Sequence, residues 1–228
     1  MSDKLRIGVI GTSWWADMAH LPVFKADTRV EMVAICGRNK KRTQEMADKY
    51  GIPNVFRNYR DMFGVNNTGL NNLSTNKLAT NNLDAVVIAT PDDEHCAMTM
   101  AALEAGLHVL CEKPLALNAH DAKAMYDKAE AKGLKHMTYF TWRWMPHYRT
   151  MHDLIEEGVL GSLFHCEFTF LMGGGRSKAY QWRFDSKRAN GVVGDSGSHV
   201  FDLARYLVGD VAKVNAQLAS HVQREGTN

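Results

Sequence analysis

The stretch from Lys4 to His20, KLRIGVIGTSWWADMAH, predicts the fold of the first part of this chain. An apolar run from Leu5 to Ile10 has the length of a buried strand and leads into the small-residue turn Gly11-Thr12-Ser13. An apolar segment of helical character follows the turn. In a βαβ unit, such a turn lets the backbone approach a pyrophosphate, and the start of the helix presents free N–H groups to it. We therefore predict a nucleotide-binding βαβ unit here, with an ordinary buried strand and turn as the alternative.

The glycine spacing in this turn departs from the usual pattern. The pattern G-x-G-x-x-G/A would fall on Gly11, Ser13 and Ala16, so serine stands where a second glycine is expected. Gly11 still suits a tight turn, and Ala16 is small enough for close packing of the helix on the strand. We expect cofactor contacts from Gly8, Gly11, Thr12, Ser13 and Trp14.

Length, charge and cysteine content limit the class of protein. The chain has 228 residues and a net charge of +2 without a block of like charges, so we expect neither a nucleic-acid nor a membrane partner. The four cysteines form no C-x-x-C pair, which favours reduced thiols over a disulfide framework or a metal site. No apolar run reaches the ~18 residues of a membrane span. Together these features predict a cytoplasmic protein.

The end of the second predicted strand bears on cofactor choice. This strand runs from Val30 to Cys36 and is followed by Gly37 and Arg38, with no acidic residue at the position that meets the adenosine ribose. A glycine leaves room there, and an arginine can pair with a 2′-phosphate. We therefore expect Gly37 and Arg38 to contact the cofactor, with NADP preferred over NAD. The alternative for Arg38 is a solvated loop charge.

Alternating strands and helices continue to Tyr139. This alternation predicts an α/β fold with a doubly wound parallel sheet of the Rossmann type. We predict that it forms a dinucleotide-binding domain over residues 1–141. The asparagine-rich stretch from Gly64 to Leu83 is predicted to be a loop or insertion. The remaining predicted elements are helix Lys40–Tyr50, strand Asp84–Thr90, helix Cys96–Ala105, strand His108–Cys111, helix Ala119–Lys132 and strand Lys135–Tyr139.

A different pattern follows, over residues 142–228. We predict a partial, truncated α+β domain for the substrate and for oligomerisation, because few elements remain to complete it. Its unfinished sheet would leave an exposed edge, which favours a homo-oligomer, a dimer or tetramer. The expected elements are helix Pro146–Glu157, strand Phe164–Leu171, the turn Gly173-Gly174-Gly175, helix Ser198–Leu207 and strand Lys213–His221.

The carboxyl ends of the predicted strands carry the first candidate site residues. Ligands bind at these ends in open α/β sheets, so Thr90 and Pro91 are expected to touch the cofactor. His95 is interpreted either as a ribose or nicotinamide contact or as a surface histidine at a helix start. Lys113 follows a buried strand and precedes Pro114, so it can donate to a substrate oxygen. The alternative for Lys113 is a surface lysine paired with its neighbour.

Asp195 and His199 form the second candidate constellation, within NGVVGDSGSHVFDLARYL. If the helix begins at or before Asp195, the two side chains lie four residues apart and share a face. Histidine suits proton exchange near neutrality, and a carboxylate beside it would orient its ring. The alternatives are an N-cap aspartate with a partly buried histidine, and a metal site that lacks a third ligand.

Five segments, in this order along the chain, resemble the Gfo/Idh/MocA family of oxidoreductases, which includes glucose-fructose oxidoreductase and inositol dehydrogenase. They are GVIGTSWWA, ICGRN, IATPDDEH, Glu112-Lys113-Pro114 and GDSGSHVFDLARYL. The resemblance extends from Lys4 to about Val214. It implies an NAD- or NADP-dependent dehydrogenase or reductase that acts on the CH-OH group of a sugar, a polyol or a related hydroxy or carbonyl compound.

The resemblance also implies roles for individual residues. Lys113 is expected near the nicotinamide, His199 as the acid-base residue on the substrate hydroxyl, and Asp195 in the substrate site. Glu112 is expected to contact the cofactor, and Arg143 to face the cofactor or the substrate.

Three features depart from the family pattern. They are Ser13, the long asparagine-rich stretch, and an end of the chain where members continue through a large antiparallel sheet. A non-catalytic nucleotide-binding regulator, or a degenerate or truncated member, is therefore the alternative function. Epimerisation or glycoside cleavage without net redox change is a third.

Overall fold

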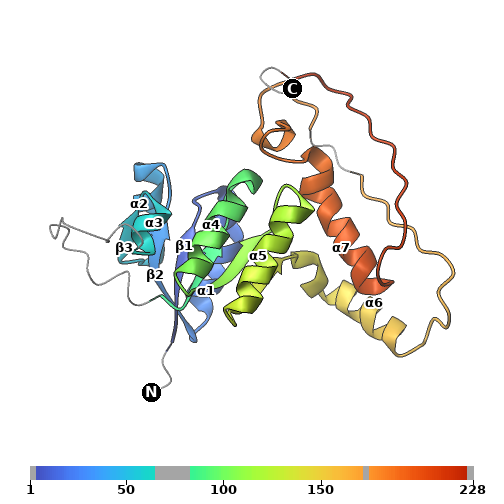
Figure 1. Ribbon diagram of the computed structural model, residues 1–228, viewed down its shortest axis with the longest axis horizontal. Helices are drawn as coiled ribbons and strands as arrows, with labels where there is room; N and C mark the ends of the chain where they lie inside the picture. Colours follow the sequence, from blue (N-terminus) through green and yellow to red (C-terminus); the bar gives the residue numbers. More distant parts are fainter. Residues whose placement is uncertain (1–3, 65–82, 172–174, 225–228) are drawn as a thin grey trace. The chain divides into compact units, whose positions relative to one another are not determined.

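The computed structural model describes residues 4–64, 83–171 and 175–224 of the chain (Figure 1). Backbone contacts divide the chain into two compact units, residues 1–138 and 139–228, which we call the N-terminal and the C-terminal unit. The asparagine-rich prediction falls almost entirely outside the described residues, as do Gly173 and Gly174. Each unit is described by itself.

The N-terminal unit is built on one six-stranded sheet with the strand order β3-β2-β1-β4-β5-β6. The pairs β1·β2, β1·β4, β2·β3 and β4·β5 are parallel. The strands are β1 (Leu5–Ile10), β2 (Val30–Cys36), β3 (Asn54–Phe56), β4 (Ala85–Ile88), β5 (His108–Glu112) and β6 (His136–Tyr139).

Helices cover both faces of this sheet, as β1 illustrates. Ile7 and Val9 pack with α1 and α2 residues on one face, whereas Ile10 packs with residues of α4 and α5 on the other. Successive strand residues point to opposite faces, so both sets are buried. The predicted doubly wound α/β fold is therefore confirmed. The helices are η1 (Ala16–His20), α1 (Leu21–Ala26), α2 (Lys40–Tyr50), α3 (Tyr59–Met62), α4 (Asp92–Glu104) and α5 (Ala119–Ala131).

Capping residues set where these helices begin and end. The Asn39 side chain accepts the backbone N–H of Arg42 at 3.0 Å at the start of α2, and Gly51 ends this helix with a φ of +70°. Helix α4 begins at Asp92 instead of the predicted Cys96. Pro91 precedes it as the N-cap. Acidic residues fill its first turn, where their negative charges interact favourably with the positive end of the helix dipole.

The C-terminal unit contains two longer helices that contact each other. The ring of His152 on α6 stacks on Tyr206 of α7, with centroids 4.2 Å apart. Both helices match the predicted ranges closely. The elements of this unit are η2 (Thr141–Trp144), α6 (Pro146–Glu156), η3 (Trp182–Phe184), η4 (Val193–Gly197) and α7 (Ser198–Leu207).

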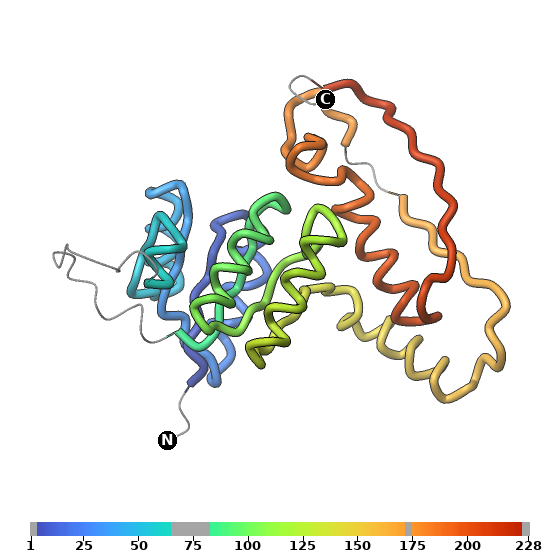
Figure 2. Tube along the Cα trace, in the orientation of Figure 1, coloured from blue at the N-terminus to red at the C-terminus, as the bar shows by residue number. Residues whose placement is uncertain are grey.

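The two predicted strands of this unit are wrong. The described residues of Phe164–Leu171 and Lys213–His221 contain no strand, and the trace runs there as irregular extended chain (Figure 2). Alternating side chains are compatible with a strand, but a strand also needs a neighbour that pairs with its N–H and C=O groups. Because they lack such pairing, these segments leave Phe164 96% and Val214 81% exposed.

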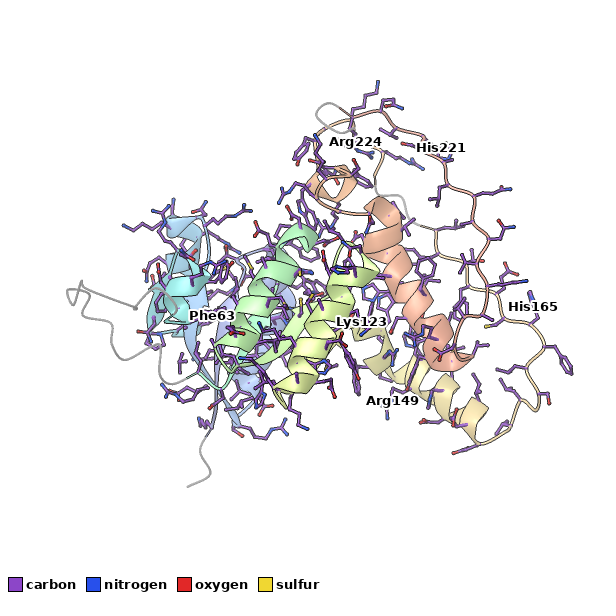
Figure 3. All side chains as sticks on the ribbon, viewed as in Figure 1. Phe63, Lys123, Arg149, His165, His221 and Arg224 are labelled. Carbon is purple, nitrogen blue, oxygen red and sulfur yellow. The ribbon has the colours of Figure 1, made fainter. Side chains whose placement is uncertain are left out.

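The chain beyond α7 returns to η3. The guanidinium of Arg224 lies over the Phe184 ring, 3.9 Å from its centroid, and donates to the carbonyl of Gly175. His165 and His221, in contrast, are exposed on the extended segments (Figure 3). None of the described helices is long and apolar enough to cross a membrane.

Candidate functional site

The strand order of the N-terminal sheet reverses between β1 and β4, which is where open α/β sheets bind ligands. Gly11 lies at this point, with a φ of +119° and its N–H bonded to the Cys36 carbonyl at 2.9 Å. A side chain at Gly11 would collide with the Ala89 carbonyl. Glycine is therefore required here both by conformation and by the close approach of the neighbouring strand end.

Ser13, at the position of the expected second glycine, caps the helix that follows. Its hydroxyl accepts the backbone N–H of Ala16 at 3.2 Å, and its carbonyl accepts the N–H of Asp17 at 3.2 Å. The first N–H groups of a helix have no partner within the helix. Thr12 is half-buried beside the turn, whereas Trp14 is 62% exposed. The predicted turn therefore presents a hydroxyl, backbone donors and an exposed aromatic ring at one edge of the sheet.

Gly37 directly follows β2, and the structure gives a packing reason for a glycine there that the sequence did not reveal. A side chain there would meet Thr43 Oγ1 at 2.5 Å and Thr12 Cγ2 at 2.6 Å. The space beside Gly37 is thus filled by two threonines of the same unit. Arg38 is exposed, and no hydrogen bond or ion pair with another described residue engages its guanidinium.

Glu112, at the end of β5, is buried and holds a hydrogen-bond network. Its Oε1 lies 2.7 Å from Nε2 of His20 and accepts the indole N–H of Trp15 at 2.6 Å. Its Oε2 accepts the backbone N–H of Lys113 at 3.3 Å. Burial raises the pKa of Glu112, but the His20 contact and the Trp15 and Lys113 donors outweigh it, so the pKa lies below its usual value.

Sequence reasoning missed His20 and Trp15 as site residues. His20 is 2% exposed and lies four positions after the buried Ala16, on the same side of the helical segment. A histidine on the apolar face of a helix, with a buried carboxylate elsewhere in the chain, is the signal that could have paired His20 with Glu112.

His95 is fully buried, so its interpretation as a surface histidine is wrong. Nδ1 lies 2.8 Å from the Pro114 carbonyl and Nε2 lies 3.0 Å from the Thr90 carbonyl. Burial lowers the pKa of His95, against the opposing effect of these carbonyls and of Glu112 and Asp93. A neutral ring carries one N–H, so it donates to one of these two carbonyls at a time.

Lys113 follows β5 directly and is half-buried, not fully exposed. The peptide bond between Lys113 and Pro114 is cis. Thr90 and Pro91, also half-buried, lie beyond the end of β4, which pairs with β5. The structure therefore brings three of the predicted site residues to neighbouring strand ends.

His199, in the C-terminal unit, is buried among aromatic rings. Its imidazole stacks on Trp142, with centroids 4.7 Å apart and planes 9° from parallel, and meets the edge of Phe140 at 6.0 Å. Trp142 in turn contacts Tyr148 and Phe170. This stacking holds the plane of the imidazole nearly parallel to the Trp142 ring.

Asp195 lies in the π-helix η4, one turn before His199 in α7. Its Oδ2 lies 3.4 Å from Nε of Arg183. Helical backbone therefore does extend from Asp195 to His199, but with a wider π-helical turn at Asp195, and a cation lies beside the carboxylate.

Arg143 was expected to face the cofactor or the substrate, but its guanidinium pairs with Asp202. Nε and Nη2 donate to the two carboxylate oxygens at 2.6 Å each, and the guanidinium also lies over the Tyr206 ring at 5.1 Å from its centroid. The Asp202 bonds raise the pKa of Arg143 above its usual value. This bidentate pair fastens η2, which carries Trp142, to α7, which carries His199.

Among the described residues, no group of three or more histidine, cysteine, aspartate or glutamate side chains is arranged to hold a metal ion.

The doubly wound sheet, the glycine turn at its switch point and the lysine at the end of β5 define a dinucleotide-binding fold. The model of the oxidoreductase family with an NAD-binding Rossmann fold matches residues 5–140, and that of the GFO/IDH/MocA C-terminal domain matches residues 148–228. The chain belongs to the GFO/IDH/MocA oxidoreductase family.

Similar proteins include levoglucosan dehydrogenase of Pseudarthrobacter phenanthrenivorans, 31% identical over 96% of this chain and 55% of the relative. A D-xylose 1-dehydrogenase (NADP(+)) of Haloferax volcanii is 31% identical over 93% of this chain and 60% of its own length. A structure of levoglucosan dehydrogenase with NADH and levoglucosan has a TM-score of 0.78 and 29% identity, over 96% of this chain and 58% of that one. The chain thus spans little more than half the length of these relatives.

Proposed function

We propose that the protein is an NAD(P)-dependent oxidoreductase that transfers a hydride between a nicotinamide cofactor and a sugar or polyol, with NADP preferred. One observation carries this proposal. Lys113 lies at the carboxyl end of β5, in the same sheet as the glycine turn that follows β1. A cation at this edge can bind the oxygen of a substrate held beside a dinucleotide.

The turn fits the diphosphate of such a cofactor. Gly11 keeps the backbone tight, Ser13 caps the helix with its own hydroxyl, and the first backbone N–H groups of the helix offer donors to an anion. Arg38 is exposed just after β2, and the residues that directly follow this strand, Gly37 to Asn39, include no acidic side chain. We propose further cofactor contacts from Gly8, Thr12, Trp14, Gly37, Thr90 and Pro91.

Each catalytic role is assigned from the chemistry of its side chain. In the oxidative direction the imidazole of His199 would accept the proton of the substrate hydroxyl, and the ammonium of Lys113 would donate a hydrogen bond to the same oxygen. Asp195 would help hold the substrate. The nicotinamide cofactor supplies the hydride chemistry when it is bound.

The names of the relatives support a sugar as the substrate class. One relative is a levoglucosan dehydrogenase and another is a D-xylose 1-dehydrogenase, so both sugars are suitable first probes. One structure holds NADH and one relative is named for NADP(+), so the relatives support either cofactor. The preference for NADP rests on Arg38 alone.

Calorimetric titration of the full chain with NADPH and, separately, NADH tests the cofactor proposal. We expect NADPH to bind more tightly, and Arg38→Ala to weaken NADPH about 10-fold or more while leaving NADH nearly unchanged. Lys41→Ala, which removes another exposed cation near the end of β2, is the matched control. Equal losses for both cofactors in Arg38→Ala would refute the 2′-phosphate contact.

Turnover of levoglucosan and D-xylose tests the catalytic proposal. We expect His199→Asn to lower kcat about 100-fold and to leave cofactor affinity unchanged, because general acid-base catalysis typically contributes factors of that order. His152→Asn, which removes another stacked histidine from the same unit, is the control for damage to packing. Unchanged turnover in His199→Asn would exclude the acid-base role.

The proposal extends to a cytoplasmic homo-oligomer, a dimer or tetramer. Large apolar side chains are exposed on the C-terminal unit, including Phe164, Leu171, Val214 and Leu218. Light scattering coupled to size-exclusion chromatography measures the oligomeric state directly, and a monomer at micromolar concentration would contradict this part.

A further inference from the structure

We propose that His20 and His95 are positioning residues that hold the backbone of Lys113 from its two sides, His20 through the Glu112 carboxylate and His95 through the Pro114 carbonyl. This inference rests on the proposed function, in which Lys113 contacts the substrate oxygen. Neither histidine needs to touch the substrate or the cofactor.

The anchor on the first side is the residue before Lys113. The Glu112 carboxylate is buried, and its Oε1 is contacted by the imidazole of His20 and the indole of Trp15 at 2.7 and 2.6 Å. Both partners lie in the helical segment that follows the turn at Gly11. Hydrogen bonds to a buried carboxylate are strong, so they tie the end of β5 to the segment that follows β1.

The anchor on the second side is the residue after Lys113. His95, near the start of α4, lies with Nδ1 2.8 Å from the Pro114 carbonyl and Nε2 3.0 Å from the Thr90 carbonyl. Its ring is therefore inserted between the loop after β4 and the loop after β5. Because His95 is fully buried, water cannot replace either contact without opening the unit.

The two anchors together restrict the backbone of Lys113, from which its side chain extends. A lysine side chain has a long, flexible stem, so the position of its ammonium group depends first on where the backbone holds its base. A displacement of about 1 Å at a catalytic group can cost about 100-fold in rate. Anchoring the residues before and after Lys113 limits that displacement.

Substitutions that keep a nitrogen at only one of the two ring positions of a histidine can distinguish a positioning role from a general role in packing. The amide nitrogen of asparagine mimics Nδ1 of histidine, and that of glutamine mimics Nε2. His95→Asn therefore places an amide N–H at the Pro114 carbonyl, whereas His95→Gln places one only at the Thr90 carbonyl. His20→Gln keeps the bond to Glu112, and His20→Phe loses it while retaining a ring that can stack on Phe24.

A matched control lies at the other end of the same strand. His108 begins β5, is half-buried, and accepts the backbone N–H of Lys135 at 3.0 Å. His108→Phe therefore removes a comparable hydrogen bond from β5, far along the strand from Lys113.

Hydrogen-deuterium exchange of the full chain, followed by mass spectrometry, measures the effect on the segment 112–115. We expect His20→Phe and His95→Gln to speed exchange there about 10-fold, and the rate of acetylation of the Lys113 amine to change in parallel. His20→Gln and His95→Asn should restore wild-type rates. His108→Phe should leave this segment unchanged even if it lowers the melting temperature.

Turnover of levoglucosan with NADP or NAD provides the second measurement. We expect His20→Phe and His95→Gln to lower kcat about 10- to 100-fold with KM unchanged, and to cause no further loss in a Lys113→Met background. Full activity in Lys113→Met would refute the catalytic role in the proposed function, whereas the exchange data would still decide how Lys113 is held.

Two results would overturn the positioning roles. One is wild-type exchange and acetylation in both His20→Phe and His95→Gln. The other is the same exchange rate of segment 112–115 in His95→Gln as in His95→Asn, because the contact with Pro114 would then have no effect.

Discussion

The N-terminal and C-terminal units differ in how far their apolar side chains are buried. In the N-terminal unit, apolar residues from both faces of the sheet are buried under helices in two clusters. In the described part of the C-terminal unit, the buried hydrophobic side chains are Ala189, Leu203 and Leu207. Apolar residues of its extended segments, such as Phe164 and Leu171, lie exposed instead.

This difference shows that a segment of alternating apolar and polar residues forms a strand and buries its apolar side chains only when another strand pairs with it. The parallel strands of the N-terminal unit pair with each other, so their side chains find helices on both faces. The extended segments of the C-terminal unit carry the same kind of side chain without pairing. We therefore expect most of the stability of the chain to reside in the N-terminal unit.

The largest expected effect comes from two matched leucine truncations. Leu103 in α4 is fully buried among sheet residues, and Leu203 in α7 is 1% exposed in the sparser C-terminal unit. We expect Leu103→Ala to cost about 4 kcal/mol and Leu203→Ala about 2 kcal/mol, because a dense core collapses less around a cavity. Hydrogen exchange on peptides of each unit during a urea titration measures both losses.

The pair also tests whether the units unfold separately. We expect Leu103→Ala to speed exchange only in the N-terminal unit, and Leu203→Ala only in the C-terminal unit. Equal losses of stability, or loss of protection in both units from one substitution, would contradict the comparison.

A smaller effect is expected from the charge network at Asp17. Its carboxylate accepts from Lys49 and Arg42 at 2.7 Å and from the Tyr50 hydroxyl at 2.8 Å. Bonds from Lys49 and Tyr50 are the main causes that lower the pKa of Asp17 from 3.8 to about 2. The stability that Asp17 contributes is therefore present above about pH 4 and is lost as the pH falls toward 2.

We expect Asp17→Asn to cost about 1 kcal/mol at pH 7, since solvent screens two partly exposed cations. The difference from the wild type should shrink as the pH is lowered from 5 to 2, which thermal denaturation across that range can measure. Asp210 pairs with Arg205 in the C-terminal unit but is exposed, so Asp210→Asn is the control and should change little. A pH-independent cost of Asp17→Asn would argue against the charge network.

The smallest perturbation is alkylation of the cysteines, which reports on the two units without any substitution. Burial raises the pKa of Cys36 and of Cys111 to about 12, so both thiols stay protonated at pH 8. Cys166 is exposed in the C-terminal unit. With iodoacetamide at pH 8 we expect Cys166 to react first, and Cys36 and Cys111 to react only through unfolding. Rapid native labelling of Cys111, read by mass spectrometry, would show that the N-terminal core opens easily.

The sequence predicted the elements of the N-terminal unit well, because their periodicity and their boundary residues agreed. The strands Leu5–Ile10 and Val30–Cys36 and the helix Lys40–Tyr50 have the predicted bounds. Two short elements, β3 and α3, escaped prediction because three or four residues carry too little periodic signal.

The site was predicted unevenly. Lys113 and the glycine turn, which we propose as site residues, lie at the ends of β5 and β1 as the sequence predicted, because it marks both strands clearly. His20 and His95 were missed or misread because their partners lie 92 and 19 residues away in the chain, and no local pattern shows such a contact. The pairing of Arg143 with Asp202 could not be predicted for the same reason, since Asp202 lies 59 residues further on.

The sequence by itself determined the doubly wound sheet, most strands and helices of the N-terminal unit, and the family to which the chain belongs. These features depend on local periodicity, glycine turns and short motifs, which neighbouring residues encode. Only the tertiary structure decided which buried polar groups meet, such as His20 with Glu112 and Arg143 with Asp202. The physical reason is that a buried charge requires a partner but does not specify where in the chain that partner lies.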